Sequence, residues 1–197
     1  SSSGICSCDA SAIGMVELEL DSFGIKNFRT NKGALIAYME GLESSSPRAL
    51  TAHVDTLGAM VKEIKSSGRL KLTALNGLEW NSVESEGCTI HTQGGGSIRG
   101  SLVLHNGALH VNKDVATSPR NADTLEVRLD ERTSSEEETR LLGIDVGDFV
   151  TFDPRVEVAE SGHIRSRFLD DKACVACVLA ALKALTAAGV TASQRTH

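Results

Sequence analysis

Between residues 60 and 165, short runs of alternating apolar and polar residues dominate the chain. A period of two is typical of β-strands that bury one face. Glycine-rich and polar turns separate the runs, and closely spaced short strands of this kind predict a small all-β sandwich or barrel. The runs cover residues 69–75, 88–92, 98–104, 108–111, 124–129 and 148–152.

The first part of the chain carries apolar residues in a different arrangement. The alternation of residues 15–20 predicts a first strand, and the apolar residues 34–39 predict a buried strand. A polar stretch over residues 41–47 reads as a loop, and it leads to a second apolar run at residues 49–55. Two apolar strands joined by a polar turn predict a central β-hairpin.

Two segments have helical character. Residues 134–142 predict one or two helical turns, with Ser134 or Ser135 as the N-cap in front of three glutamates. Residues 173–188 are nearly all Ala, Leu, Val and Cys, which predicts a buried helix. This helix contains Lys183 and is too short to span a membrane. Together with the flanking strands, it indicates an α/β framework.

The β-rich block lies inside this framework, which indicates one domain inserted into another. We expect residues 1–59 and 166–197 to be the two segments of an α/β domain. Residues 60–165 would then form the inserted all-β domain. A chain of 197 residues is long enough for one large domain or two small ones.

Composition excludes several classes of function. Aromatic residues make up only 4% of the chain, the net charge is −6, and no cluster of Lys and Arg is present, so we expect no nucleic-acid partner. No run of 18 apolar residues occurs, and the first residues lack the features of a signal peptide, so we expect no membrane partner. The five cysteines are odd in number and irregularly spaced, which favours reduced thiols and a cytoplasmic location.

His53 and Asp55 stand at the end of the apolar run 49–55. If this run is a strand, their spacing of two places both side chains on one face. A neutral imidazole binds divalent metals, and a carboxylate behind it can fix its tautomer. The alternative is a partly exposed strand end that carries two polar residues.

Asp170 and Asp171 precede the apolar helix and offer a second place for metal chemistry. A carboxylate has two oxygens, so an aspartate at this junction could bridge two cations. Aspartate is also among the best N-cap residues. The capping role is the simpler interpretation of this stretch taken alone.

Other candidate groups have simpler interpretations as well. Cys6 and Cys8 could form a four-thiolate zinc site with Cys174 and Cys177, but cysteines in an apolar helix usually pack as small apolar residues. The glycines at 94–96 lack the Lys and Ser/Thr of a phosphate-binding loop. The remaining candidates are expected on strands or solvated faces: His91, His105, His110, His163 and the glutamates at 136–138.

Four stretches, in order along the chain, resemble motifs of the M42 family of metallo-aminopeptidases, which includes glutamyl and tetrahedral aminopeptidases. Thr-Ala-His-Val-Asp-Thr-Leu-Gly at 51–58 resembles the first metal-ligand motif, and Phe-Leu-Asp-Asp-Lys at 168–172 resembles the Leu-Asp-Asp-Arg motif. Residues 142–148 resemble the end of that family's inserted domain, and residues 30–37 resemble its strand pair before the first motif. The resemblance covers about residues 15–190.

The resemblance implies a three-layer α/β catalytic domain interrupted by a β-rich dimerisation domain, with dimers built into a dodecamer. It implies a peptide substrate and two divalent metal ions, zinc or cobalt. His53 would be a ligand of one ion, Asp170 would bridge the two, and Asp55 would orient His53 from behind. The two ions would polarise the peptide carbonyl and activate a shared water, with a Glu as general base.

The sequence departs from the family pattern after Asp170. A Glu-Glu pair, a further Asp and a last His are due in the family, and none of them falls within the 197 residues; His197 lacks the family context of that ligand. We therefore expect the chain to carry the N-terminal part of the site and to be inactive alone. The alternative is a non-catalytic relative that serves as an assembly or interaction module.

Overall fold

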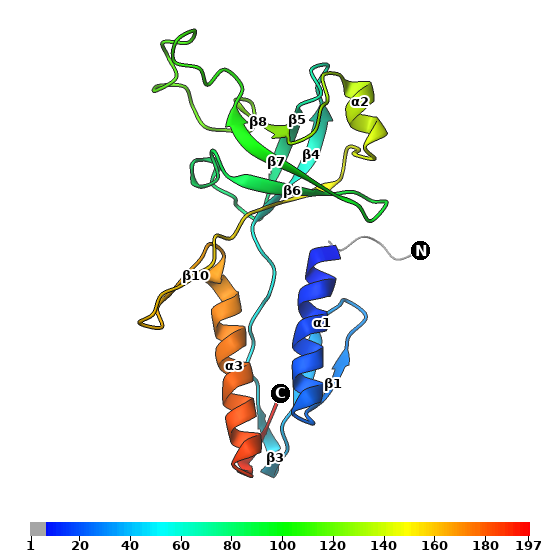
Figure 1. The fold of residues 1–197 in the computed structure, drawn as a ribbon. Helices are drawn as coiled ribbons and strands as arrows, with labels where there is room; N and C mark the ends of the chain where they lie inside the picture. The colour runs from blue at the N-terminus through cyan, green and yellow to red at the C-terminus, as the bar shows by residue number, and fades with distance from the viewer. Residues whose placement is uncertain (1–6) are drawn as a thin grey trace. The chain divides into compact units, whose positions relative to one another are not determined.

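The computed structural model describes residues 7–197, and the chain divides into two compact units. Unit 1 consists of the residues up to Asp55 together with Phe168–His197, and unit 2 consists of Thr56–Arg167. Unit 2 is therefore inserted into the sequence of unit 1. Figure 1 shows the elements of both units.

Unit 2 is built on a closed antiparallel barrel with the strand order β4-β5-β8-β7-β6-β9. The predicted β-rich character of this block is thus present, although a short helix and a 3-10 turn accompany the strands. The elements are β4 (Gly58–Ile64), β5 (Leu70–Leu75), η1 (Trp80–Ser82), β6 (Gly87–His91), β7 (Ser97–Leu104), β8 (Leu125–Leu129), α2 (Glu136–Leu141), β9 (Phe149–Phe152), β10 (Glu157–Val158) and β11 (Ile164–Arg165).

The alternation seen in the sequence places one face of each strand inside the barrel. In β6, Cys88 and Ile90 are fully buried, and in β9, Val150 and Phe152 are buried. Residues between them point away from the core, since successive side chains of a strand lie on opposite faces. The barrel therefore encloses a continuous apolar core.

Helix α2 forms as its sequence predicts. Ser135 is the N-cap, and its hydroxyl accepts a hydrogen bond from the backbone N–H of Glu138. Thr139 is buried and donates its hydroxyl to the carbonyl of Gly68, at 2.9 Å, so the helix packs on the β4–β5 turn. Gly68 has a φ of 79°, and a Cβ there would lie 3.0 Å from the Thr139 hydroxyl. A glycine is required at this turn for both reasons.

Two buried glutamates form ion pairs that attach loops of unit 2 to its barrel. Glu126 on β8 is 4% exposed and accepts hydrogen bonds from Lys65 and Arg69, each at 2.5 Å. These two cations flank the β4–β5 turn, so the ion pairs attach that turn to β8. Charge-assisted bonds to a buried carboxylate are stronger than exposed ion pairs.

Glu86 forms the second buried cluster. Its carboxylate lies 2.7 Å from a guanidinium nitrogen of Arg155 and 2.7 Å from one of Arg167. Arg167 also donates to the carbonyl of Ser82, and its backbone N–H donates to the carbonyl of Pro154. The last residue of unit 2 is thus fixed to the segment before β6.

The predicted strand at residues 108–111 is wrong. This stretch belongs to an irregular connection between β7 and β8 that is held by side chain–backbone hydrogen bonds. Asn112 donates to the carbonyl of Asn106, and Arg120 donates to the carbonyls of Val115 and Ser118. Such local bonds compete with strand pairing.

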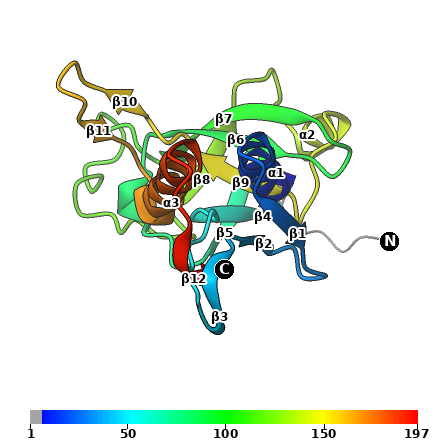
Figure 2. The same cartoon turned by 90° about the horizontal axis from the view of Figure 1, so that it is seen from below.

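Within the residues that the structure describes, unit 1 has two helices and two short sheets. The elements are α1 (Ser7–Ser22), β1 (Lys26–Arg29), β2 (Leu35–Tyr38), β3 (Gly41–Arg48), α3 (Leu169–Ala187) and β12 (Ala192–Thr196). β1 pairs antiparallel with β2, and β12 pairs parallel with β3. Figure 2 shows β12 alongside β3.

Several strand predictions in unit 1 are wrong. Residues 15–20 lie in α1, and residues 41–47 form most of β3 rather than a loop. Residues 49–55 form no strand, so the predicted hairpin with β2 is absent. The hairpin does not form because this part of the chain pairs with the C-terminal segment instead. β3 pairs with β12, and the backbone N–H of Leu50 donates a hydrogen bond to the carbonyl of His197, which follows β12.

Helix α3 is confirmed as a helix, but the prediction that it is buried is wrong. None of its residues is buried, and among the described side chains of unit 1 only Leu20 is, with 3% exposure. No helix within residues 7–197 has the length and apolar content to cross a membrane. The three-layer arrangement remains a prediction, because the described strands of unit 1 form two separate two-stranded sheets.

Candidate metal centre

The candidate residues of unit 1 come from two distant parts of the sequence. His53 and Asp55 lie on the extended segment that follows β3, and Asp170 lies at the start of α3. Phe168 precedes it with a left-handed backbone, and the peptide bond between Asp170 and Asp171 is cis. Both aspartates have non-helical dihedrals. Because of these dihedrals, Asp170 stands outside the regular helix, and the N-cap position is occupied by Phe168.

The structure brings all three predicted residues together. The Nδ1 atom of His53 lies 2.9 Å from an oxygen of Asp55, and its Nε2 atom lies 3.2 Å from Oδ1 of Asp170. If Nδ1 carries the proton of the neutral imidazole and donates it to Asp55, then Nε2 carries the lone pair. That lone pair faces Asp170. This is the arrangement in which a carboxylate orients a metal-binding imidazole.

The separation of the two inner donors fits a shared cation. Zinc bonds of about 2.0–2.1 Å in a tetrahedral arrangement place two donor atoms roughly 3.3 Å apart. The observed Nε2–Oδ1 separation of 3.2 Å agrees with that value. The side chains of His53 and Asp55 are 52% and 53% exposed, and that of Asp170 is 92% exposed, so further donors can approach.

The donor set is nevertheless incomplete within this chain. Among the side chains that the structure describes, those of residues 12–197, no group of three or more His, Cys, Asp or Glu residues is positioned to hold a metal. Two inner donors hold a cation weakly, because structural and catalytic zinc sites use three or four protein ligands. A cation held at this place would need further donors beyond His53 and Asp170.

The other sequence candidates lie outside this group. His91 contacts the hydroxyl of Thr151 at 2.9 Å, and His105 contacts the carbonyl of Thr124 at 3.0 Å, both within unit 2. Glu138 accepts hydrogen bonds from Ser134 at the start of α2, which is a capping role. The four-thiolate cluster stays a prediction, since Cys6 and the side chain of Cys8 lie outside the described residues.

One contact beside the centre has no counterpart in the sequence analysis. The thiol of Cys174 is hydrogen-bonded to Asp171, and this bond raises the pKa of Cys174 above its ordinary value. The two residues are three apart, a spacing at which side chains meet on a helix, and they meet here although Asp171 itself has non-helical dihedrals. That spacing is the signal from which the pair could have been inferred.

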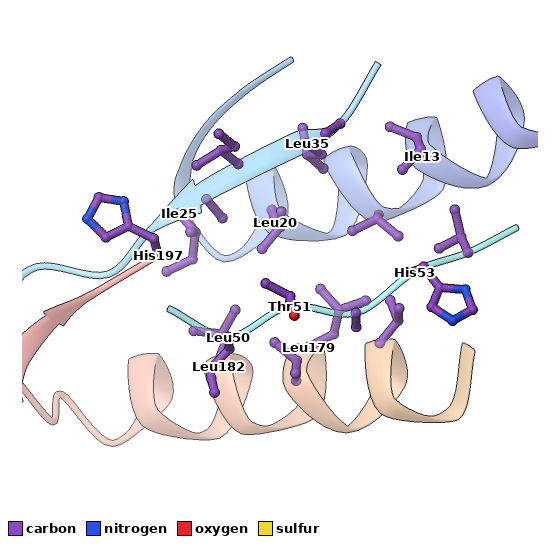
Figure 3. Close-up of a pocket in the computed structure, with 18 of the residues that line it drawn as sticks. Ile13, Leu20, Ile25, Leu35, Leu50, Thr51, His53, Leu179, Leu182 and His197 are labelled. Carbon is purple, nitrogen blue, oxygen red and sulfur yellow. The ribbon is translucent and has the colours of Figure 1, made fainter. Parts of the chain in front are cut away.

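An apolar cavity of about 730 Å³ borders His53 in unit 1. Figure 3 shows Ile13 and Leu20 of α1 on one side, and Leu179 and Leu182 of α3 on the other, with the segment that carries Leu50, Thr51 and His53 between them. His53 and His197 lie toward opposite ends of this cavity (Figure 3). The cavity wall is thus built from both sequence segments of unit 1.

Comparison with known proteins identifies the family of this chain. Residues 33–194 match the family described as M42 glutamyl aminopeptidase. The protein YhfE of Bacillus subtilis (strain 168), whose name assigns it to the aminopeptidases, is 45% identical over 185 residues, which are 94% of this chain and 54% of YhfE. The chain spans about half the length of the curated relatives that it matches.

Solved structures show the same fold. An aminopeptidase from the archaeon Desulfurococcus kamchatkensis is 26% identical, with a TM-score of 0.79 over 95% of this chain and 49% of that chain. The TET1 peptidase of Pyrococcus horikoshii is 21% identical, with a TM-score of 0.73 over 93% of this chain and 53% of that chain. Since the family match covers well over half of the chain, the protein belongs to the M42 glutamyl aminopeptidase family.

Proposed function

We infer that the protein contributes the N-terminal part of a dinuclear metal site that hydrolyses N-terminal residues from peptides. The observation that supports this most is the contact of His53 with two carboxylates, Asp55 through Nδ1 and Asp170 through Nε2. Family membership gives the reaction class. By the family resemblance, the remaining donors would follow Asp170 in the complete protein.

Each residue has one role in this proposal. His53 would hold one ion through Nε2, and Asp170 would be the ligand shared by both ions, with zinc or cobalt as the expected metals. Asp55 is a positioning residue that accepts the Nδ1 proton and so keeps Nε2 free for the metal. When bound, the two ions supply Lewis-acid polarisation of the peptide carbonyl and lower the pKa of a bound water.

The same proposal includes self-assembly. The Pyrococcus horikoshii TET1 peptidase, by its title, assembles into a tetrahedron or a large octahedral shell. Unit 2 is the candidate dimerisation domain, because it has its own closed barrel and buried core. The second candidate function is that of an assembly module without catalysis. The closed barrel and the buried core of unit 2 favour it as well.

Activity assays on the complete natural protein separate these functions. Release of amino acids from short peptides, together with zinc or cobalt content, is expected for the wild type. His53→Ala and Asp170→Ala should each lower kcat/KM by at least about 100-fold. His163→Ala, in an exposed turn of unit 2, is the matched control and should keep full activity. Full activity in either site variant would overturn the assignment, and an inactive but assembled wild type would favour the second candidate.

A further inference from the structure

Helix α3 carries two exposed free thiols within its first turns. Cys174 and Cys177 are exposed, whereas Cys88, inside the barrel of unit 2, is fully buried. Burial raises the pKa of Cys88 to about 12. The chain thus presents two thiols to solvent on one helix and keeps a third inaccessible, which gives an internal control.

The helix sets the distance between the two cysteines. Backbone dihedrals in α3 are helical after Asp171, so residues 174 and 177 lie on a regular helix. A spacing of three then places the two Cα atoms about 5 Å apart. Disulfides join cysteines whose Cα atoms are roughly 4.4–6.8 Å apart. The Cα separation thus suits a disulfide, and the Cβ atoms, about 5–6 Å apart at this spacing, need only a small local adjustment of the helix to reach the roughly 3.5–4.5 Å of a disulfide.

Packing leaves both thiols uncovered. The residues of α3 that line the cavity of unit 1 are Val175, Val178, Leu179 and Leu182. Cys174 and Cys177 are not among them, and Cys177 points to the opposite side of the helix by the 100° step per residue. The neighbouring positions 173, 176 and 180 are alanines, which are too small to shield a thiol.

We propose that Cys174 and Cys177 form a reactive dithiol that low-molecular-weight disulfides oxidise to an intrahelical disulfide. The thiolate of Cys177 attacks one sulfur of the oxidant, which forms a mixed disulfide and releases one equivalent of thiol. The thiolate of Cys174 then attacks Sγ of Cys177 and releases the second equivalent. The protein loses two electrons and two protons, and the oxidant is reduced to two thiols.

Formation of the disulfide changes the hydrogen bonding of a neighbouring residue, Asp171. The thiol hydrogen that Cys174 shares with Asp171 is lost when the disulfide forms. Asp171 directly follows Asp170 in the chain. The oxidation state of the dithiol therefore changes the hydrogen bonding of the residue next to the candidate metal ligand. The dithiol itself does not depend on the proposed function.

Peptide mapping tests the proposal directly. The folded chain, with Cys6 and Cys8 replaced by Ser, is equilibrated in oxidised glutathione, alkylated and cleaved by trypsin. Both cysteines fall in one expected tryptic peptide, residues 173–183, which ends at Lys183 and contains no other cysteine. We expect this peptide unalkylated and about 2 Da lighter than the dithiol, the mass of two hydrogens. Cys88 should be unmodified.

Single variants identify the two steps. Cys174→Ser and Cys177→Ser should each stop at a mixed disulfide with one glutathione, because no second thiol can resolve it. Persistent mixed disulfide in the protein with both thiols, or two free thiols after equilibration at an oxidising ratio, would overturn the proposal. Closure that occurs only in denaturant would overturn it too, since the helix would then hold the thiols apart.

Discussion

Unit 1 and unit 2 contain similar kinds of apolar residues but differ in how many of them are buried. In unit 2, Leu70, Leu72, Leu102 and Ile90 have no exposure at all. In unit 1, large apolar side chains remain in solvent, including Met15 at 68% and Leu50 at 64% exposure. The strands of unit 2 close into a barrel, whereas those of unit 1 form separate pairs. In the described chain, nearly all fully buried apolar side chains therefore lie in the unit whose hydrogen-bonded ladder is closed.

The comparison predicts that the two units differ in stability. Each apolar side chain that is fully buried contributes roughly 1.5–3 kcal/mol, and nearly all such side chains of the described chain lie in unit 2. The sequence offers a probe for each unit, because the single Trp, Trp80, lies in unit 2 and the single Tyr, Tyr38, lies in unit 1. Their fluorescence reports the two units separately.

The largest expected change in the free energy of unfolding comes from Leu72 of unit 2, and Leu20 of unit 1 is its matched control. Leu72→Ala should lower the free energy of unfolding of unit 2 by about 2–5 kcal/mol, because it leaves a cavity in the barrel. Leu20→Ala removes the buried leucine of unit 1, and the urea transition of Trp80 should then shift by less than about 0.5 kcal/mol. Equal shifts of the Trp80 transition in both variants would show that the units unfold together and would break the comparison.

Glu126 tests whether ion pairs help to close the barrel. Burial tends to raise the pKa of its carboxyl, but the hydrogen bonds from Lys65 and Arg69 outweigh burial and hold the pKa below its ordinary value. The group therefore stabilises unit 2 above the unfolded-state pKa, and this contribution is lost as pH falls through the folded-state pKa. Glu126→Gln should cost about 1.5–3 kcal/mol at pH 7.

Urea unfolding followed by Trp80 at pH 7 and near pH 3 measures this effect. The wild type should lose more stability between the two pH values than Glu126→Gln does. The exposed Glu137 provides the control, and Glu137→Gln should leave the pH dependence unchanged. Identical pH profiles for the wild type and Glu126→Gln would mean that the ion pairs do not stabilise the closed barrel.

Gly100 on β7 tests how closely the strands of the barrel approach. A Cβ at this position would lie 2.8 Å from the carbonyl oxygen of Arg128 and 2.8 Å from Cγ1 of Val127. Gly100→Ala should destabilise unit 2 by about 1–3 kcal/mol through overpacking. Gly94 is the control, because the nearest atom to a Cβ added there would be 3.9 Å away. A neutral Gly100→Ala would indicate a looser contact between β7 and β8.

The smallest effect is expected at the N-cap of α2. Ser135→Ala removes the acceptor for the backbone N–H of Glu138 and should cost about 1 kcal/mol in the Trp80 transition. The exposed Ser161 lies in the β10–β11 turn, and Ser161→Ala should be neutral. If Ser135→Ala is neutral as well, α2 frays independently and is not part of the cooperative unit 2.

The sequence predicted unit 2 better than unit 1 for a physical reason. The strands of the barrel bury one face each, so the alternation in β6 and β9 reports burial directly. Helix α2 carries its start signal locally, in Ser135 and the glutamates after it. The irregular connection before β8 was missed because side chain–backbone bonds such as that of Asn112 are not visible as a pattern.

Unit 1 depends on partners that are remote in sequence. β3 is polar and contains Pro47, which reads as a loop, and it becomes a strand only because β12 pairs with it. The contact of His53 with Asp55 could be anticipated from a spacing of two, although no strand holds them. The contact of His53 with Asp170 could not be derived from spacing, because the two residues are 117 positions apart. It was expected from the β-rich insertion between the two stretches and from the family resemblance.

The cluster around Glu86 has a mechanical consequence. Arg167 is the last residue of unit 2, and its side chain is attached to Glu86 and Ser82 while its backbone is attached to Pro154. A force applied to the chain at Phe168 is therefore first borne by these bonds, before it reaches the ladder of β9. When the chain is pulled at Phe168, the strands of the barrel should unfold only after the bonds of the Glu86 cluster have broken.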